Sequence, residues 1–213
     1  MNISNNTIKT GIPPLIYKAG YKEKAEYKEF IIKLIFSFIF AVLMAISANS
    51  FFYLPFTPVP ITIQVATVFM SAIFLGSKWA AASQLQYILM GIMGFPVFSG
   101  FKSGIIALTG PTGGYIIGFL AAAFITGYII ENANFTISNS GNNIIIYFFA
   151  CIIGLSLIYL LGYIQLVGFL SSIYIYKNYA DLLIAGWNLG VKPFLIIDFI
   201  KILIILNIFK LYK

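Results

Sequence analysis

The chain has 213 residues, of which 61% are hydrophobic and only 9% are charged, and its net charge is +7. Soluble domains average about 45–50% apolar and about 25% charged residues, so this composition excludes a soluble globule and predicts an integral membrane protein. Histidine is absent and all 13 basic residues are lysines without base-stacking motifs, which excludes His-based catalysis, His metal sites, guanidinium clamps and a nucleic-acid partner.

The apolar runs predict six transmembrane helices, because a hydrocarbon core of about 30 Å needs about 20 helical residues. We expect an all-α integral membrane fold in which a polar N-terminal segment, residues 1–30, precedes a six-helix membrane domain, residues 31–213. The charged N-terminal segment is expected to be solvated or to contact lipid headgroups. The helices are predicted at residues 31–53, 60–75, 79–95, 111–130, 144–172 and 193–209.

The first predicted helix carries a stripe of small residues, Ser37, Ala41 and Ala45, at four-residue spacing. Such a stripe lets another helix approach closely, and that helix could belong to this chain or to another subunit. The proline-rich segment 54–60 ends the first helix and presets the start of the second.

Gly76 and Lys78 separate the second predicted helix from the third, which places Gln86 and Tyr87 in its outer half. These two polar side chains are expected either to face a cavity or to make interhelical hydrogen bonds. The segment 94–110 that follows is too irregular and too polar to span, so it should lie over the membrane or fold into a cavity.

The sixth predicted helix contains two charged residues, Asp198 and Lys201. Ionisable groups at membrane depth cost at least about 2.5–3.5 kcal/mol each, so they normally face a bundle interior or a wet cavity and indicate a functional site. Their spacing puts both on one helix face. The alternatives are a salt bridge that only neutralises two buried charges and snorkelling of Lys201, although a merely neutral pair could be replaced by apolar residues with little loss.

Six helices put both termini on one side of the membrane, and the lysines indicate which side. Eight lysines lie on the side of the termini and three in the opposite loops, so both termini are predicted to be cytoplasmic. No phosphate-binding loop, carboxylate cluster or His/Cys set is present, so we expect no enzyme activity and no cofactor. Transport against a gradient would need a partner or a coupling ion.

Four short segments stand in order at the expected loops and helix starts. They are LPFTPVPIT at 54–62, GFPVF at 94–98, GPTGGY at 110–115, and Pro193-Phe194 followed by Asp198 and Lys201. Together they closely resemble the BioY family, the biotin-specific substrate-binding (S) components of energy-coupling factor (ECF) transporters. The resemblance covers residues 35–209.

The resemblance implies biotin uptake by a multi-pass subunit of the bacterial cytoplasmic membrane. The subunit would capture biotin from the outer side and deliver it inward with a transmembrane coupling subunit and two ATPase subunits, which alone use ATP, or would work as a homo-oligomer. It also implies that Asp198 and Lys201 belong to the biotin site and that the stripe of Ser37, Ala41 and Ala45 contacts the coupling subunit.

Biotin has a ureido ring with two N–H donors and one carbonyl acceptor, an apolar sulfur ring and a chain that ends in a carboxylate. Asp198 can accept from the ureido N–H groups, and Lys201 can donate to a carbonyl or orient Asp198. Lys102 is the candidate cation for the carboxylate, as the only charge in segment 94–110, where relatives offer arginine. The alternative is a solvated loop lysine.

Three other functions are open. An S component for a different vitamin would share the fold. A membrane-embedded lipid enzyme could use Asp198 and Lys201 as an acid–base pair, but no nucleophile or metal set accompanies them. A structural scaffold could use the buried pair only to fix helix register.

Overall fold

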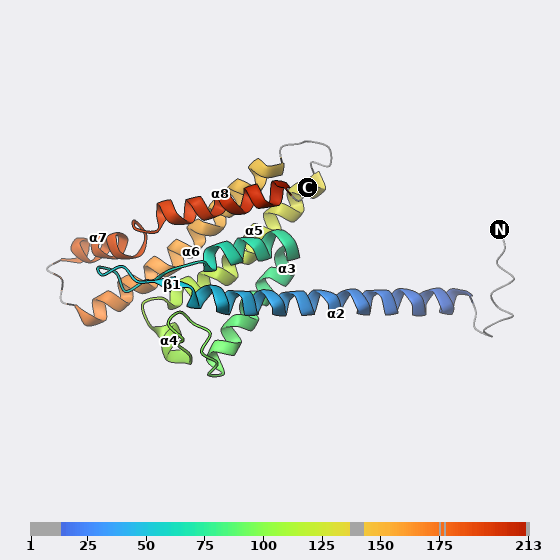
Figure 1. Ribbon diagram of the computed structural model, residues 1–213, viewed down its shortest axis with the longest axis horizontal. Helices are drawn as coiled ribbons and strands as arrows, with labels where there is room; N and C mark the ends of the chain where they lie inside the picture. The colour runs from blue at the N-terminus through green and yellow to red at the C-terminus, as the bar shows by residue number, and fades with distance from the viewer. Residues whose placement is uncertain (1–13, 137–142, 175, 177, 212–213) are drawn as a thin grey trace. The chain divides into compact units, whose positions relative to one another are not determined.

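A computed structural model describes residues 14–136, 143–174, 176 and 178–211, and it is almost entirely helical (Figure 1). The elements in chain order are α2 (Pro14–Asn49), β1 (Phe51–Phe52), β2 (Ile61–Thr62), α3 (Gln64–Ile92), α4 (Ile105–Thr109), α5 (Gly113–Thr136), α6 (Asn143–Ile173), α7 (Tyr179–Gly190) and α8 (Leu195–Leu211).

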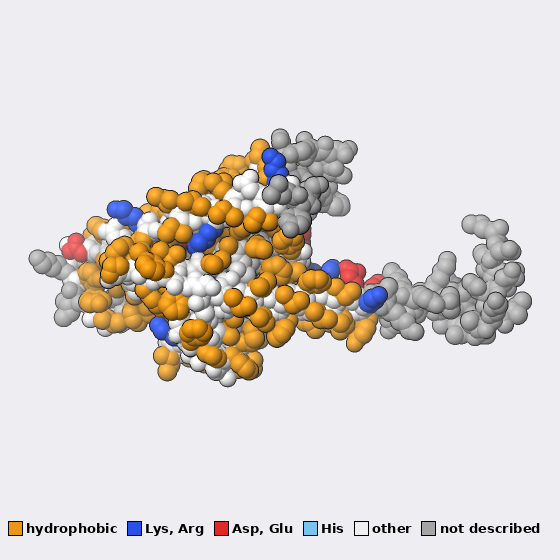
Figure 2. Space-filling view, viewed as in Figure 1, with side chains coloured by type: hydrophobic (Ala, Val, Ile, Leu, Met, Phe, Trp, Pro, Cys, Tyr) orange, Lys and Arg blue, Asp and Glu red, His pale blue; other side chains and the backbone are white. Residues whose placement is uncertain are grey.

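In the described part of the chain, four helices are long and apolar enough to cross a membrane. These segments are Glu26–Asn49, Gln64–Ile92, Gly113–Ala133 and Ile144–Ile173. On the face shown in Figure 2, apolar side chains cover most of the surface of residues 37–213 and charged side chains are few. Large apolar side chains are half-exposed on several of these helices, as a surface in contact with hydrocarbon requires. The chain is therefore a helical multi-pass membrane protein.

The second and third predicted helices form one element, α3, that is interrupted at Gly76. The backbone of Gly76 has φ 75° and ψ 179°, outside the helical region and at a φ that favours glycine. Ser77 starts the second half of α3, and its backbone N–H and its hydroxyl both donate to the carboxylate of Glu131 on α5, at 2.8 and 2.6 Å. The predicted break at Gly76 is confirmed, and a carboxylate from another helix caps it.

Contacts within the chain divide it into two units, residues 1–36 and residues 37–213. In the first unit, described from Pro14 onward, an exposed ion pair joins Lys33 to Glu29 at 2.7 Å. The expected boundary at residue 30 does not coincide with a helix end, because α2 runs without interruption from Pro14 to Asn49. Residues 1–13 of the predicted N-terminal segment lie outside the described residues.

Helix α5 is the centre of the larger unit, since it packs along both α3 and α6 (Figure 1). Glycines make this close approach possible: a Cβ atom at Gly114 would lie 2.3 Å from the carbonyl oxygen of Leu161, and one at Gly118 would lie 2.9 Å from Cα of Ile158. Small residues at helix contacts are typical of membrane bundles, where backbone proximity replaces the hydrophobic effect as the source of packing energy.

Segments far apart in the sequence meet at one end of the bundle. The hydroxyl of Thr57, between β1 and β2, donates to the carbonyl oxygen of Leu189 at 2.5 Å, and the Tyr115 hydroxyl donates to that of Gly190 at 2.8 Å. Leu189 and Gly190 belong to α7, a helix that the sequence did not predict. Asn178 caps that helix, and Leu182 is buried on its inner face.

Candidate functional site

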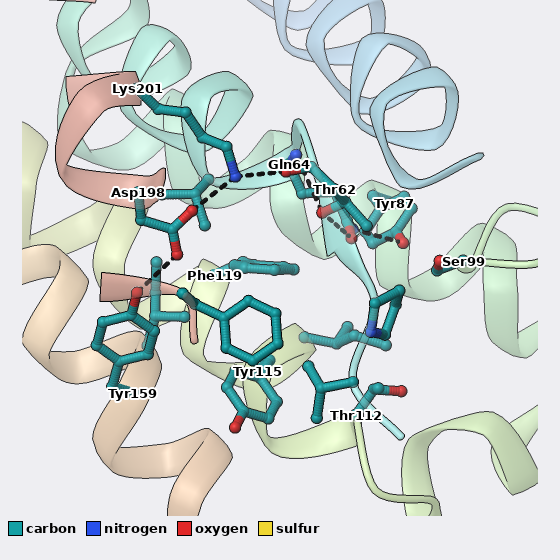
Figure 3. Close-up of a pocket in the computed structure, with 16 residues that line it drawn as sticks. Thr62, Gln64, Tyr87, Ser99, Thr112, Tyr115, Phe119, Tyr159, Asp198 and Lys201 are labelled. Carbon is teal, nitrogen blue, oxygen red and sulfur yellow. Dashed lines mark hydrogen bonds and ion pairs between the residues drawn. The ribbon is translucent and has the colours of Figure 1, made fainter. Parts of the chain in front are cut away.

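A cavity lies at this end of the bundle, and residues from β2, α3, α5, α6 and α8 line it together with the proline-rich and 94–104 segments (Figure 3). It offers about 60 Å³ to the centres of water molecules. One buried water needs about 10–15 Å³ measured in this way, so the cavity has room for several waters. Its wall combines aromatic and aliphatic side chains with a few polar groups, the usual composition of a small-molecule site.

Asp198 and Lys201 both face this cavity. Nζ of Lys201 donates to Oδ1 of Asp198 at 2.6 Å and to the carbonyl oxygen of Thr62 at 2.6 Å. The hydroxyl of Tyr159 donates to Oδ2 of Asp198 at 2.7 Å, and the aspartate is only 4% exposed. The predicted shared helix face is thus correct, and Lys201 bonds inside the cavity instead of snorkelling.

The hydrogen bonds among Asp198, Lys201 and Tyr159 leave donor and acceptor positions free for a ligand. A carboxylate can accept about four hydrogen bonds, and each oxygen of Asp198 accepts one within the described chain. An ammonium group has three N–H donors, and Lys201 uses two of them. The cavity therefore presents a fixed carboxylate acceptor beside a fixed ammonium donor.

Tyr87 also lines the cavity, and it is 1% exposed. Its hydroxyl accepts from Nε2 of Gln64 at 3.1 Å, and its ring meets that of Phe98 edge-on at a centroid distance of 5.5 Å. Gln86 lies outside the cavity and donates instead to Oγ of Ser37 at 2.9 Å. The side chain of Gln86 therefore points to α2, whereas that of Tyr87, the next residue, lines the cavity.

The small stripe on α2 packs inside this chain. Ser37 and Ala41 are fully buried, Ala45 is half-buried against the core, and Gln86 of α3 bonds to Ser37. The structure therefore favours the alternative in which the stripe packs against a helix of the same chain. Ser37 and Ala41 are inaccessible in this structure, whereas Ala45 is partly exposed, so a contact between the stripe and a coupling subunit stays a prediction.

The side chain of Lys102 does not line the cavity in this structure. It pairs with Phe98 in a β-bridge, with backbone N–H to O distances of 3.0 and 3.2 Å, and its side chain is exposed. This tight turn directs Ser99 to the cavity and leaves Lys102 outside it. Among the described residues that line the cavity, Lys201 is the only cation.

Several lining residues were not identified from the sequence. Tyr159 is the most important of them, because it bonds directly to Asp198. The sequence feature that could have identified Tyr159 is its position within the apolar run 144–172, because a buried tyrosine hydroxyl normally has a hydrogen-bond partner. Tyr115, Phe119 and Ile158 add apolar wall. Within the described part of the chain, no group of three His, Cys, Asp or Glu residues could hold a metal ion.

The chain is similar in sequence to proteins named as biotin transporters. The biotin transporter BioY of Thermotoga maritima is 34% identical over 166 residues, which are 78% of this chain and 86% of the relative. The probable biotin transporter BioY of Pyrococcus horikoshii is 37% identical over 144 residues, 68% of this chain and 74% of the relative.

Similarity to a solved structure supports the fold. A crystal structure of the S-component for biotin from an ECF-type ABC transporter superposes with a TM-score of 0.65 at 23% identity, covering 86% of this chain and 93% of the other. The sequence model of the BioY family matches residues 21–213, nearly the whole chain. The chain therefore belongs to the BioY family.

Proposed function

We propose that this chain is the biotin-binding S component of an ECF transporter and takes up biotin through the cavity bordered by Asp198 and Lys201. One observation carries the proposal: a buried carboxylate on α8 is fixed by Tyr159 and Lys201 and still has acceptor capacity toward the cavity. The sequence match to relatives that are named biotin transporters covers most of their length and supports the same ligand.

The ureido ring of biotin matches this arrangement. Its two N–H groups can donate to the unused acceptor positions of Asp198, and its carbonyl oxygen can accept from the remaining N–H of Lys201. The rings of Tyr115 and Phe119 and the side chain of Ile158 provide the apolar wall for the sulfur ring. Because a charge assists the hydrogen bonds to Asp198 and Lys201, these bonds are stronger than neutral ones.

Ligand entry requires the cavity to widen. Its 60 Å³ is small beside the roughly 300–1,000 Å³ of typical small-molecule sites. The proline-rich segment 54–60 and the segment 94–104 close one end of the cavity without long helices of their own. The long helices that carry Asp198 and Tyr159 hold the polar groups of the site in place.

The remaining parts of the proposal concern the assembly. The two halves of α3, together with α2, α5, α6 and α8, make six membrane passes with both termini in the bacterial cytoplasm. A coupling subunit and two ATPase subunits supply the energy, or the chain acts as a homo-oligomer. The chain itself binds and carries the ligand and catalyses no reaction.

Binding of radiolabelled biotin to the purified protein tests this function. Excess unlabelled biotin should displace the label, whereas thiamine, riboflavin and niacin should not. Asp198→Asn should weaken binding, and Asp181→Asn, an exposed aspartate in the first turn of α7, should not. Retention of another vitamin with no biotin binding would contradict the proposal, and unchanged biotin affinity in Asp198→Asn would favour a merely structural pair.

A further inference from the structure

Ser99 is a half-buried polar residue that lines the cavity and makes no contact with the trio of Asp198, Lys201 and Tyr159. Its Oγ atom is inaccessible to solvent and has no hydrogen-bond partner in the described chain. Figure 3 shows Ser99 at the opposite end of the cavity from Asp198 and Lys201, on the side of Thr112. Buried hydroxyl groups without partners are rare and require an explanation, such as a bound water, ion or ligand.

The position of Ser99 is fixed by its neighbours in the turn. The β-bridge between Phe98 and Lys102 closes the turn around it. The ring of Phe98 packs on Tyr87 and lies so close to Gly91 that a Cβ atom there would clash with it at 2.0 Å. Ser99 is therefore directed at the cavity by packing on α3 and not by chance orientation of a loose loop.

A second anchor holds the segment from the side of α2. Oδ1 of Asn49 accepts from the backbone N–H of Phe101 at 2.8 Å, and its Nδ2 donates to the carbonyl oxygen of Pro96 at 3.5 Å. Phe101 has φ 56°, a left-handed backbone that costs energy for a residue other than glycine. The hydrogen bond that the Phe101 N–H donates to Asn49 helps to stabilise this conformation, and with it the turn that presents Ser99.

The chemistry at the Ser99 end differs from that at the Asp198 end. Lys201, the only cation among the described lining residues, is already bonded to Asp198 and Thr62 at the far end. A serine hydroxyl can donate one hydrogen bond, and a carboxylate is the strongest acceptor on a ligand whose other end is a ureido ring. We propose that Ser99 donates to the carboxylate of the bound ligand, so that this end is recognised by a neutral hydroxyl without a cation. This inference rests on the proposed function.

The test compares two ligands in the same variants: biotin and an analogue whose chain ends in a methyl group. Loss of one hydrogen bond to a charged acceptor should lower biotin affinity roughly tenfold or more in Ser99→Ala. Affinity for the methyl-terminated analogue should change less than twofold. Because the readout is a ratio of two affinities in one preparation, partial misfolding of the variant cancels. Ser172→Ala, at an exposed serine bonded to its own helix, is the matched control and should leave both affinities unchanged.

The outcomes separate this inference from the function itself. A selective loss for biotin in Ser99→Ala supports the inference. Equal losses for both ligands, or no loss for either, would overturn it while the wild-type protein still binds biotin. A wild-type protein that binds neither ligand would refute the proposed function and the inference with it.

Discussion

Tyr159→Phe isolates one hydrogen bond of the site. The substitution removes the hydroxyl that donates to Oδ2 of Asp198 at 2.7 Å and keeps the ring that forms part of the wall. Asp198 would retain Lys201 on its other oxygen, so its charge stays paired. The change therefore affects the orientation of the carboxylate and leaves its ionic partner in place.

The expected magnitude follows from the type of bond. A hydrogen bond to a charged group contributes about 1.5–3 kcal/mol, and about 1.4 kcal/mol corresponds to a factor of ten in affinity. We expect biotin affinity to fall at least tenfold in Tyr159→Phe, measured by equilibrium binding of labelled biotin to protein in lipid nanodiscs. Tyr163→Phe is the matched control, one turn further along α6, because its hydroxyl donates to the neutral carbonyl oxygen of Leu183 at 3.1 Å. It should change stability slightly and affinity not at all.

Two results would refute this reasoning. Wild-type affinity in Tyr159→Phe would mean that the orientation of Asp198 does not matter for binding. Equal losses in Tyr159→Phe and Tyr163→Phe would mean that α6 packing, and not the bond to Asp198, sets the affinity.

Three further predictions test the fold and the charged pair. Lys201→Met should lower the stability of the protein by about 3–5 kcal/mol because it leaves a buried carboxylate without its cation. Adding Asp198→Asn to this variant should restore stability, measured by thermal unfolding, but not the binding of labelled biotin. Restored biotin binding in the double variant would contradict the site. Gly114→Ala should lower the unfolding temperature because its new methyl group meets a backbone carbonyl of α6. The control Gly168→Ala, with open space around it, should stabilise α6 or leave it unchanged. Equal shifts of the unfolding temperature in both variants would contradict close packing as the cause. Glu131→Gln should destabilise the protein by about 1–2 kcal/mol through the weaker cap on the second half of α3, and an unchanged unfolding temperature would show that the cap contributes nothing.

Much of the helical frame could be predicted from the sequence, because membrane helices must satisfy their backbone hydrogen bonds internally and must therefore be long apolar runs. The break at Gly76 was also readable, since glycine interrupts the run there. Helix α7 was missed because its segment is short and mixed in polarity. The two-residue strands β1 and β2 were missed because their pairing depends on how the proline-rich turn folds back, which local pattern does not determine.

Site residues of a type that is rare in membrane helices could be predicted from the sequence, whereas residues that only the three-dimensional fold brings to the cavity could not. Asp198 and Lys201 were found because charges in a membrane helix are expensive. Tyr159 is one of 14 tyrosines, and only the fold shows which of them reaches the aspartate. Gln86 was one of two polar candidates in the outer half of its predicted helix, and Lys102 was the only charge in segment 94–110. In the structure Gln86 bonds to Ser37 on α2, and the turn closed by the Phe98 bridge leaves the Lys102 side chain outside the cavity lining.

A structure of the protein determined with bound biotin tests the central claim most directly. The account predicts the ureido ring within hydrogen-bond distance of the Asp198 carboxylate and next to Nζ of Lys201, with the chain extending toward Ser99. Biotin bound elsewhere on the protein, or an Asp198–Lys201 pair that remains closed on itself without touching the ligand, would contradict it.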